Sequence, residues 1–251
     1  MSTNASNTAS NSQSRTTKKA LSVIETLAEA GNGGYLSLIE LSKRTEMDKA
    51  TVYRILNTLI DLGYIEKNEA KYRLTLRLLD LAMNTVRNKS LTELARPHLL
   101  QLADETGERA FLAVLDGNEV VQIDKVEGNP TIRVVSEIGS RFPLHCTSSG
   151  KVFLAYLPSD RSDHLLQQVS LSPCTERTAA TPEQIGRELE FVRSAGFAES
   201  NGEYRDHERS FAAPLLRGES EIVASIGVAG TTMTLTNSKR ELVVPRLVDH
   251  A

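Results

Sequence analysis

The sequence predicts an α+β protein of two domains, a small helical domain followed by a larger domain built on an antiparallel sheet. The chain has 251 residues, enough for two ordinary domains. Residues 15–90 carry a net charge of +4, whereas residues 91–251 carry −7. Apolar residues recur at helical spacing in the first part, and strand and helix patterns are mixed in the second. A basic first part indicates that this domain faces a polyanion.

The composition is that of a soluble globular protein, with 40% apolar and 24% charged residues. No apolar run approaches the roughly 18 residues of a membrane span, and the N-terminus lacks the pattern of a signal peptide. We therefore expect a cytoplasmic protein that does not bind membranes. Residues 1–14 are uncharged and almost wholly polar, so we expect a disordered tail over residues 1–16.

Two helices are expected next. The spacing of apolar residues predicts a helix over 18–28, ended by the glycines at 31–34. The S-x-x-E spacing of Ser37 and Glu40 predicts a capping box and a short helix over 38–45.

A third helix follows a three-residue connection and completes a helix-turn-helix. Asp48 is placed to cap it, and Gly63 ends it. Its apolar stripe consists of Val52, Ile55, Leu56, Leu59 and Leu62. Two short strands at 64–66 and 72–74 then predict the wing of a winged helix, which completes a domain over 17–75.

The chemistry of the third helix suits a DNA groove. Arg54 can donate two bonds to guanine and Asn57 can pair with adenine, whereas cations on the wing can contact phosphates. The alternative is the solvated face of an ordinary three-helix domain. We predict DNA contacts from Ser37, Lys49, Ala50, Thr51, Tyr53, Arg54, Asn57, Lys67 and Lys71.

A linker helix is expected over residues 76–90. Its stripe of Leu76, Leu79, Met83 and Val86 has the spacing of a short coiled coil. Because helix-turn-helix proteins generally bind DNA as dimers, this helix is a candidate for pairing two chains.

Residues 91–251 are expected to form the second domain, an antiparallel sheet with helices outside it. The hairpin signal Asp116-Gly117-Asn118 joins two of its strands. Helices are predicted from Leu91 to Gly107, from about Gly150 and over 182–196; strands are predicted over 110–115, 120–126, 131–136, 209–216 and 222–228.

The stretch FPLHCTSSGK, residues 142–151, concentrates reactive side chains. It lacks the glycine of a phosphate loop, and its S-x-x-K spacing comes without the companion motifs of β-lactamases. We therefore predict no catalytic residue. Ser148 and Ser149 precede a predicted helix, where amides and hydroxyls suit a small carboxylate, although the serines can also simply cap the helix.

The two cysteines, Cys146 and Cys174, form neither a C-x-x-C pair nor a spaced metal set. We predict no metal and no cofactor, and interpret both thiols as inert. A metal site of His145, Cys146 and His207 is an alternative.

Three stretches resemble the IclR family of bacterial transcriptional regulators: LSLIELSKRTEMDKATVYRILNTLIDLGYI, IGSRFPLHCTSSGKVFLAYL and GFAESNGEYRDHERSFAAPL. The resemblance implies a winged-helix dimer or tetramer that binds a near-palindromic operator. It also implies a GAF-like second domain that binds a small organic acid. The resemblance further implies a regulator, such as a repressor, of a catabolic operon.

The resemblance also implies an effector pocket with Ser148, Ser149, Ser200, Ser210, Gly227 and Ala229. The last two stand where the glyoxylate-responsive member has serines, so we expect a larger or less polar effector than glyoxylate. His207 replaces a family glycine, and Phe211 replaces an aliphatic residue.

The effector itself is expected to be a sugar acid. KYRLTLRLLDLA and CTERT are similar to members that sense 2-keto-3-deoxygluconate. An aromatic acid is the alternative, and a small-molecule enzyme or sensor that uses the FPLHCTSSGK pocket is a remote one.

Overall fold

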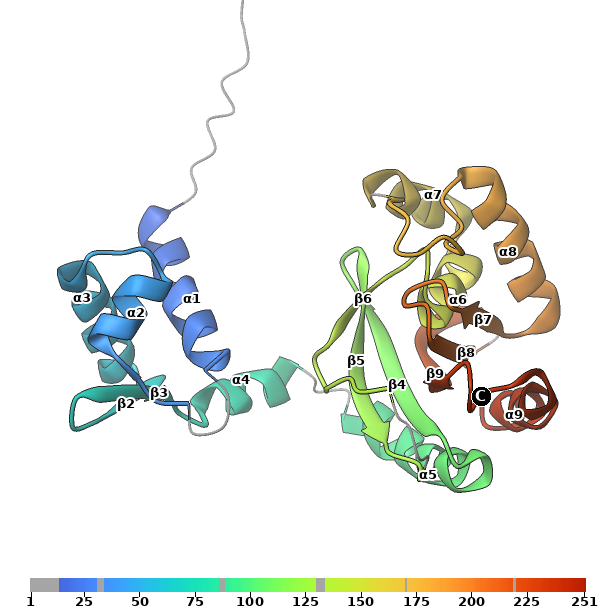
Figure 1. The fold of residues 1–251 in the computed structure, drawn as a ribbon, viewed down its shortest axis with the longest axis horizontal. Coiled ribbons are helices and arrows are strands. Elements are labelled where there is room, and N and C mark those ends of the chain that lie inside the picture. The colour runs from blue at the N-terminus through green and yellow to red at the C-terminus, as the bar shows by residue number, and fades with distance from the viewer. Residues whose placement is uncertain (1–13, 31–33, 86–88, 130–133, 170, 219) are drawn as a thin grey trace, which may run out of the picture. The chain divides into compact units, whose positions relative to one another are not determined.

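The computed structural model describes residues 14–30, 34–85, 89–129, 134–169, 171–218 and 220–251 (Figure 1). Two compact units divide the chain, residues 1–87 and residues 88–251. The predicted α+β class is confirmed, with helices and antiparallel sheets in both units. No helix among the described residues is long and apolar enough to cross a membrane.

The first unit packs three helices on a small sheet. Helix α1 (Arg15–Ala28) begins after Ser14, inside the segment expected to be a disordered tail. Helix α2 (Leu38–Arg44) begins with the predicted capping box, since the Glu40 carboxylate accepts from the Ser37 amide at 2.8 Å and Ser37 Oγ accepts from the Glu40 amide. Helix α3 (Lys49–Asp61) begins at Asp48, whose Oδ1 accepts from the Thr51 amide at 2.9 Å.

The wing is a hairpin with tighter geometry than expected. Strands β2 (Ile65–Asn68) and β3 (Lys71–Leu74) pair with Asn68 opposite Lys71, which leaves a two-residue turn. Glu69 in this turn has a φ of 53°. A third strand that the sequence did not indicate, β1 (Leu36–Ser37), pairs with β3 just before α2.

Two helices occupy the region of the expected linker. Helix α4 spans Arg77–Thr85, and α5 spans Lys89–Thr106. Of the expected stripe, Leu76 and Leu79 are 76% and 53% exposed. The side chains of Met83 and Val86 lie outside the described residues.

The second unit is built on a six-stranded sheet whose neighbouring strands are all antiparallel. In the order of the sheet, these are β6 (Arg141–Pro143), β5 (Glu119–Val126), β4 (Arg109–Asp116), β9 (Glu221–Thr231), β8 (Glu208–Arg217) and β7 (Ala198–Asn201). The strand expected over 131–136 lies partly outside the described residues, and its described part, 134–136, is irregular. The edge strand is β6 instead.

Helices cover both faces of this sheet (Figure 1). Because side chains alternate along a strand, Phe111 and Ala113 of β4 face one layer, whereas Ala110 and Leu112 face the other. The first layer contains α6 (Ser148–Tyr156), α7 (Ser159–Gln168) and α8 (Pro182–Ala195); the second contains α5 and α9 (Asn237–Asp249).

Helix α6 begins earlier than the sequence suggested. Its N-cap is Thr147, whose Oγ1 accepts from the Gly150 amide at 3.2 Å, so Ser148 and Ser149 lie in the first turn. This turn lies against the preceding loop. A Cβ on Gly150 would lie 2.1 Å from the carbonyl oxygen of Leu144, which is backbone and has little freedom to move.

Gly150→Ala is therefore expected to destabilise the second unit by about 3 kcal/mol or more, because overpacking here displaces backbone. Gly186→Ala is the matched control, since Gly186 lies in α8 with nothing within 4 Å of its added Cβ. That change is expected to stabilise the unit by about 0.5–1 kcal/mol. Urea unfolding of both variants measures the difference, and equal effects would contradict the packing described for α6.

Candidate functional site

The exposed face of α3 carries most of the residues predicted to contact DNA. At about 100° per residue, this face is centred on Ala50, Arg54 and Asn57, opposite the buried part of the apolar stripe. Leu62, at the end of that stripe, is 54% exposed. Lys49 and Tyr53 lie to one side of the centre and are exposed. The half-buried Thr51 lies to the other side, and it borders a groove with α1 together with Arg54.

The remaining predicted DNA residues lie in the wing and at the start of α2. Lys67 and Lys71 are exposed on β2 and β3. Ser37 is occupied by the capping box, since its Oγ donates to Glu40 at 2.7 Å. Arg73, another wing cation, forms an ion pair with Glu66 and stacks over the Tyr35 ring at 5.0 Å. Among the described residues of the wing, Lys67 and Lys71 form no ion pair, although Lys67 Nζ lies 5.8 Å from the centroid of the Tyr72 ring.

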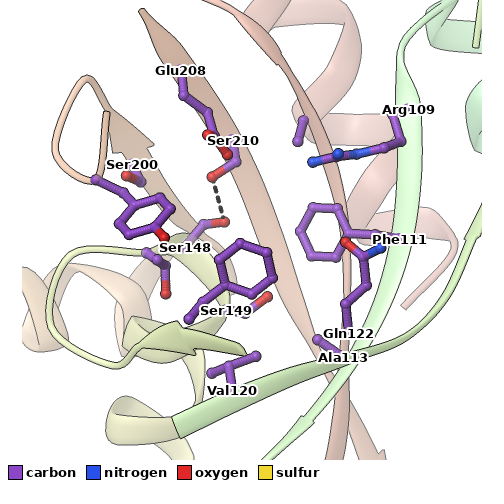
Figure 2. Close-up of a pocket in the computed structure, with 14 residues that line it drawn as sticks. Arg109, Phe111, Ala113, Val120, Gln122, Ser148, Ser149, Ser200, Glu208 and Ser210 are labelled. Atoms are coloured by element: carbon purple, nitrogen blue, oxygen red, sulfur yellow. Dashed lines mark hydrogen bonds between the residues drawn. The ribbon is translucent and has the colours of Figure 1, made fainter. Parts of the chain in front are cut away.

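In the second unit a cavity lies between the sheet and the first turn of α6 (Figure 2). The volume of this cavity that the centres of water molecules can occupy is about 40 Å³, which is room for roughly three waters. Its lining combines rings, hydroxyls and two charged groups. The lining residues are Arg109, Phe111, Ala113, Val120, Gln122, Phe142, Thr147, Ser148, Ser149, Ser200, Tyr204, Glu208, Ser210 and Ala229.

The four predicted serines meet at this cavity and are buried. Ser148 Oγ and Ser210 Oγ are hydrogen bonded at 2.8 Å. Ser200 Oγ donates to the carbonyl of Cys146 at 2.9 Å. Ser149 Oγ is buried and has no partner among the described residues. Because Ser148 and Ser149 lie at the N-terminus of α6, unpaired amides and the positive end of the helix dipole lie beside their hydroxyls.

Of the other two predicted pocket positions, Ala229 lines the cavity and Gly227 does not. Gly227 pairs with Phe111 across β9 and β4, and a Cβ on this glycine would lie 2.2 Å from the Phe111 ring. The ring therefore occupies the space that a serine at 227 would use. The glycine therefore does not enlarge the cavity, although the lack of a serine hydroxyl at this position was one reason to expect a larger effector.

Arg109 is the cation of the cavity, and it is 4% exposed. Its Nη1 donates to Ser136 Oγ at 2.7 Å and to the Val134 carbonyl at 3.1 Å. Its Nε is buried without a hydrogen-bond partner among the described residues. Burial lowers the pKa of this guanidinium, and the negative charge of Glu208 opposes that shift. An arginine nonetheless stays charged, so the cavity holds a cation with unused hydrogen-bonding capacity.

Glu208 lies on the other side of the cavity from Arg109 (Figure 2). Its Oε2 is buried with no hydrogen-bond partner among the described residues, and the nearest ion-pair atom is Arg205 Nη1 at 3.7 Å. Burial raises the pKa of the Glu208 carboxyl, although Arg109 and Arg205 act in the opposite direction. The two charged groups of the cavity thus face each other without forming an ion pair.

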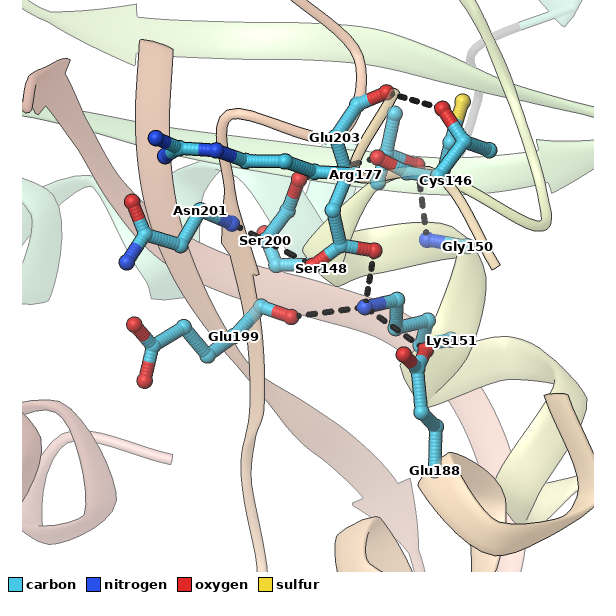
Figure 3. A network of polar contacts seen from close by, with 12 residues as sticks. Cys146, Ser148, Gly150, Lys151, Arg177, Glu188, Glu199, Ser200, Asn201 and Glu203 are labelled. Carbon is cyan, nitrogen blue, oxygen red and sulfur yellow. Dashed lines mark hydrogen bonds and ion pairs between the residues drawn. The ribbon is translucent and has the colours of Figure 1, made fainter. Parts of the chain in front are cut away.

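Lys151, one turn into α6, points into a separate network (Figure 3). Its Nζ lies 2.5 Å from Glu203 and 2.8 Å from Glu188, and it donates to the Glu199 carbonyl at 2.9 Å. Burial raises the pKa of Glu203, and the Lys151 charge opposes that rise. The S-x-x-K spacing therefore does not give Ser148 a base, because the lysine is held by carboxylates.

The other candidate nucleophile is equally unsuited to catalysis. Cys146 is fully buried, and burial raises the pKa of its thiol. Its sulfur lies 3.3 Å from that of Cys174. His207 is exposed in the turn before β8, and the cluster of possible metal ligands around Cys146 contains Cys174 in its place among the described residues.

Sequence reasoning missed both charged residues of the cavity. Arg109 opens β4 and Glu208 opens β8, and both positions read as ordinary solvent-facing strand ends. One weak signal exists: Glu108 and Arg109 are charged residues that enter a strand whose next four residues are apolar.

Comparison with known protein families gives a match for each of the two units. Residues 16–69 match the model of the IclR helix-turn-helix domain, and residues 83–251 match that of the bacterial transcriptional regulator IclR C-terminal domain. The chain is 32% identical to the HTH-type transcriptional regulator KdgR of Escherichia coli, covering 90% of this chain and 87% of that protein.

Solved structures agree with this assignment. The Thermotoga maritima IclR has a TM-score of 0.80 and 30% identity, covering 94% of this chain and 95% of that one. An IclR homolog from Microbacterium hydrocarbonoxydans, solved in complex with 4-hydroxybenzoate, has a TM-score of 0.77 at 23% identity, covering 94% and 97%, and shows the fold. The chain therefore belongs to the IclR family, and it is a DNA-binding transcriptional regulator rather than an enzyme.

Proposed function

We propose that this regulator binds its operator through the exposed face of α3 and the wing lysines. Arg54 and Asn57 at the centre of this face provide base contacts, whereas Lys49, Lys67 and Lys71 contact phosphates. Ala50 lets the helix approach the base edges closely. Ser37 acts indirectly, because its side chain holds the start of α2 and leaves no free hydroxyl for DNA.

We further propose that a small organic acid binds the cavity with its carboxylate at Arg109. The buried Nε of this arginine, which has no hydrogen-bond partner among the described residues, carries the proposal. A buried cation with unused donors is costly, and a carboxylate would satisfy it with charge-assisted hydrogen bonds. Ser149 Oγ and the first amides of α6 would supply further donors.

A sugar acid such as 2-keto-3-deoxygluconate is our first candidate. The similarity of two segments to sugar-acid-sensing members supports it, as does the hydroxyl-rich end of the cavity. An aromatic acid is the second candidate, because the rings of Phe111, Phe142 and Tyr204 line the same space. Either acid has more heavy atoms than roughly three waters, so binding would require the cavity to widen.

We also propose that the protein acts in the cytoplasm as a homodimer or homotetramer on a near-palindromic operator. A two-fold symmetric protein matches a two-fold symmetric site. Leu76 directly precedes α4, and Leu79 lies on this helix. Both apolar side chains are exposed, and a second copy of the chain would cover them. The acid would then favour one arrangement of the subunits and change operator affinity. Repression of a catabolic operon is the simplest outcome.

Arg54→Ala is expected to weaken operator binding by about 1–3 kcal/mol and to relax base preference, because a bidentate base contact is lost. Mobility shifts with the protein's own upstream region measure the affinity. The control is Arg161→Ala, which removes an exposed arginine from α7 in the other unit. Unchanged affinity in Arg54→Ala would remove α3 from the proposal.

Arg109→Met is expected to lose most of the acid-dependent rise in melting temperature, since about 1.5–3 kcal/mol of charge-assisted bonding is removed. Thermal-shift screening of sugar acids, aromatic acids and their neutral amides provides the ligand. Arg96→Met is the control, because Arg96 pairs with Asp124 outside the cavity. If the Arg109 variant responded to the acid as the parent does, the carboxylate would bind elsewhere.

Glu208→Gln is expected to raise affinity for the acid at neutral pH and to flatten its pH dependence. In the parent, affinity should rise as pH falls through the raised pKa of Glu208, because protonation removes a negative charge that repels the ligand. The unliganded parent should also lose stability as pH rises from the ordinary carboxyl value of 4.5 through the raised value, since the folded state holds the proton more tightly. Titration calorimetry across this pH range measures the affinity of both proteins for the acid. If the parent and Glu208→Gln showed the same pH dependence of affinity, Glu208 would not have this role.

A further inference from the structure

Three possible metal ligands meet outside the cavity, and two of them directly precede the N-cap of α6. They come from His145, Cys146 and Cys174, whose ligand atoms all lie within 4.8 Å of one another. His145 and Cys146 are buried, whereas Cys174 is exposed. The two cysteines are 28 residues apart, so the fold rather than a local motif brings them together.

The histidine ring is oriented as a metal ligand requires. His145 Nε2 lies 3.1 Å from the carbonyl oxygen of Ser172. A carbonyl can only accept, so Nε2 carries the proton and Nδ1 presents a lone pair. Nδ1 is buried, and it has no hydrogen-bond partner among the described residues. A histidine that binds a metal commonly donates its other N–H to a backbone carbonyl in this way.

The spacing of the sulfurs is closer to that of a shared metal than to that of a disulfide. Two thiolates on one tetrahedral Zn²⁺, each about 2.3 Å from the ion, lie roughly 3.8 Å apart. The sulfurs of a disulfide lie about 2.05 Å apart. The two sulfurs lie 3.3 Å apart. They would have to separate by roughly half an ångström to share a metal ion, but approach by more than about an ångström to form a disulfide.

The loop that carries Cys174 is held in place by its own hydrogen bonds. Thr178 Oγ1 accepts from the Cys174 amide at 3.0 Å and donates to the Glu203 carbonyl at 2.7 Å. Thr175 Oγ1 donates to the Gly202 carbonyl at 2.6 Å. Cys174 is thus presented to Cys146 by a fixed loop, while its exposure provides an entry path and leaves a fourth coordination position open to water.

We propose that His145, Cys146 and Cys174 form a binding site for a thiophilic divalent cation, for which Zn²⁺ is the probe. Two sulfurs and one imidazole nitrogen match the preference of this ion, and a water completes the tetrahedron. The site is separate from the proposed effector contacts, so it does not depend on the identity of the acid.

The test titrates reduced, metal-free full-length protein with Co²⁺ and then with Zn²⁺. One equivalent of Co²⁺ should produce the near-ultraviolet absorption of a cobalt–thiolate bond, and Zn²⁺ should abolish this absorption. Zn²⁺ should also raise the melting temperature. Cys174→Ser, a change at an exposed position, should remove one thiolate and weaken Zn²⁺ binding by about tenfold or more.

The control is His98→Gln. His98 Nδ1 lies 3.0 Å from His250 Nδ1, which makes this pair another place where metal ions could bind. Binding that survives Cys174→Ser but is lost in His98→Gln would overturn the proposal. Reduced protein that takes up no metal, while its two thiols form a disulfide in air, would overturn it as well. Circular dichroism establishes that both variants fold.

Discussion

The close contact between Gly150 and the backbone of Leu144 is the constraint on which the ligand end of the second unit depends. Because residue 150 has no side chain, α6 can begin directly against the loop that follows β6. This places the amide end of the helix, with Ser148 and Ser149, at the cavity instead of burying it. Lys151 in the same turn is held by Glu188 and Glu203, so the turn is fixed on its other side as well.

Charge in the cavity is arranged for a ligand more than for stability. Arg109 on β4 is buried, forms no ion pair among the described residues and has no hydrogen-bond partner there for its Nε. Other buried charges of the unit are paired, as Arg209 is with Glu199 at 2.7 Å and Lys239 with Glu108 at 2.6 Å. An unpaired charge in the interior destabilises the protein unless something binds to it, so the exception marks the site.

Local chemistry was readable from the sequence wherever a short segment determines its own structure. The capping box at Ser37 and the cap at Asp48 each depend on residues three positions apart, and both form as predicted. Ser148 and Ser149 were identified from the predicted helix start, whereas Ser200 and Ser210 were identified only through family resemblance. Arg109, Glu208 and the meeting of Cys146 with Cys174 depend on strand pairing and loop placement across many residues, which periodicity does not encode. The start of α6 was misplaced because Thr147, Ser148 and Ser149 are all good caps, and tertiary packing at Gly150 selects among them.

Cys146 connects the two proposed sites. Its sulfur lies in the metal-ligand cluster, whereas its carbonyl accepts from Ser200 in the cavity wall. Binding of a cation would move the Cys146 sulfur by roughly half an ångström. Because Cys146 is fully buried and closely packed, its neighbours would have to move with it. Such a displacement would act on Ser200 through its hydrogen bond to the Cys146 carbonyl, at the wall of the cavity where the acid would bind. By linkage, whatever factor the cation applies to the affinity for the acid, the acid applies to the affinity for the cation. The cation and the acid would then both affect the position of the first turn of α6.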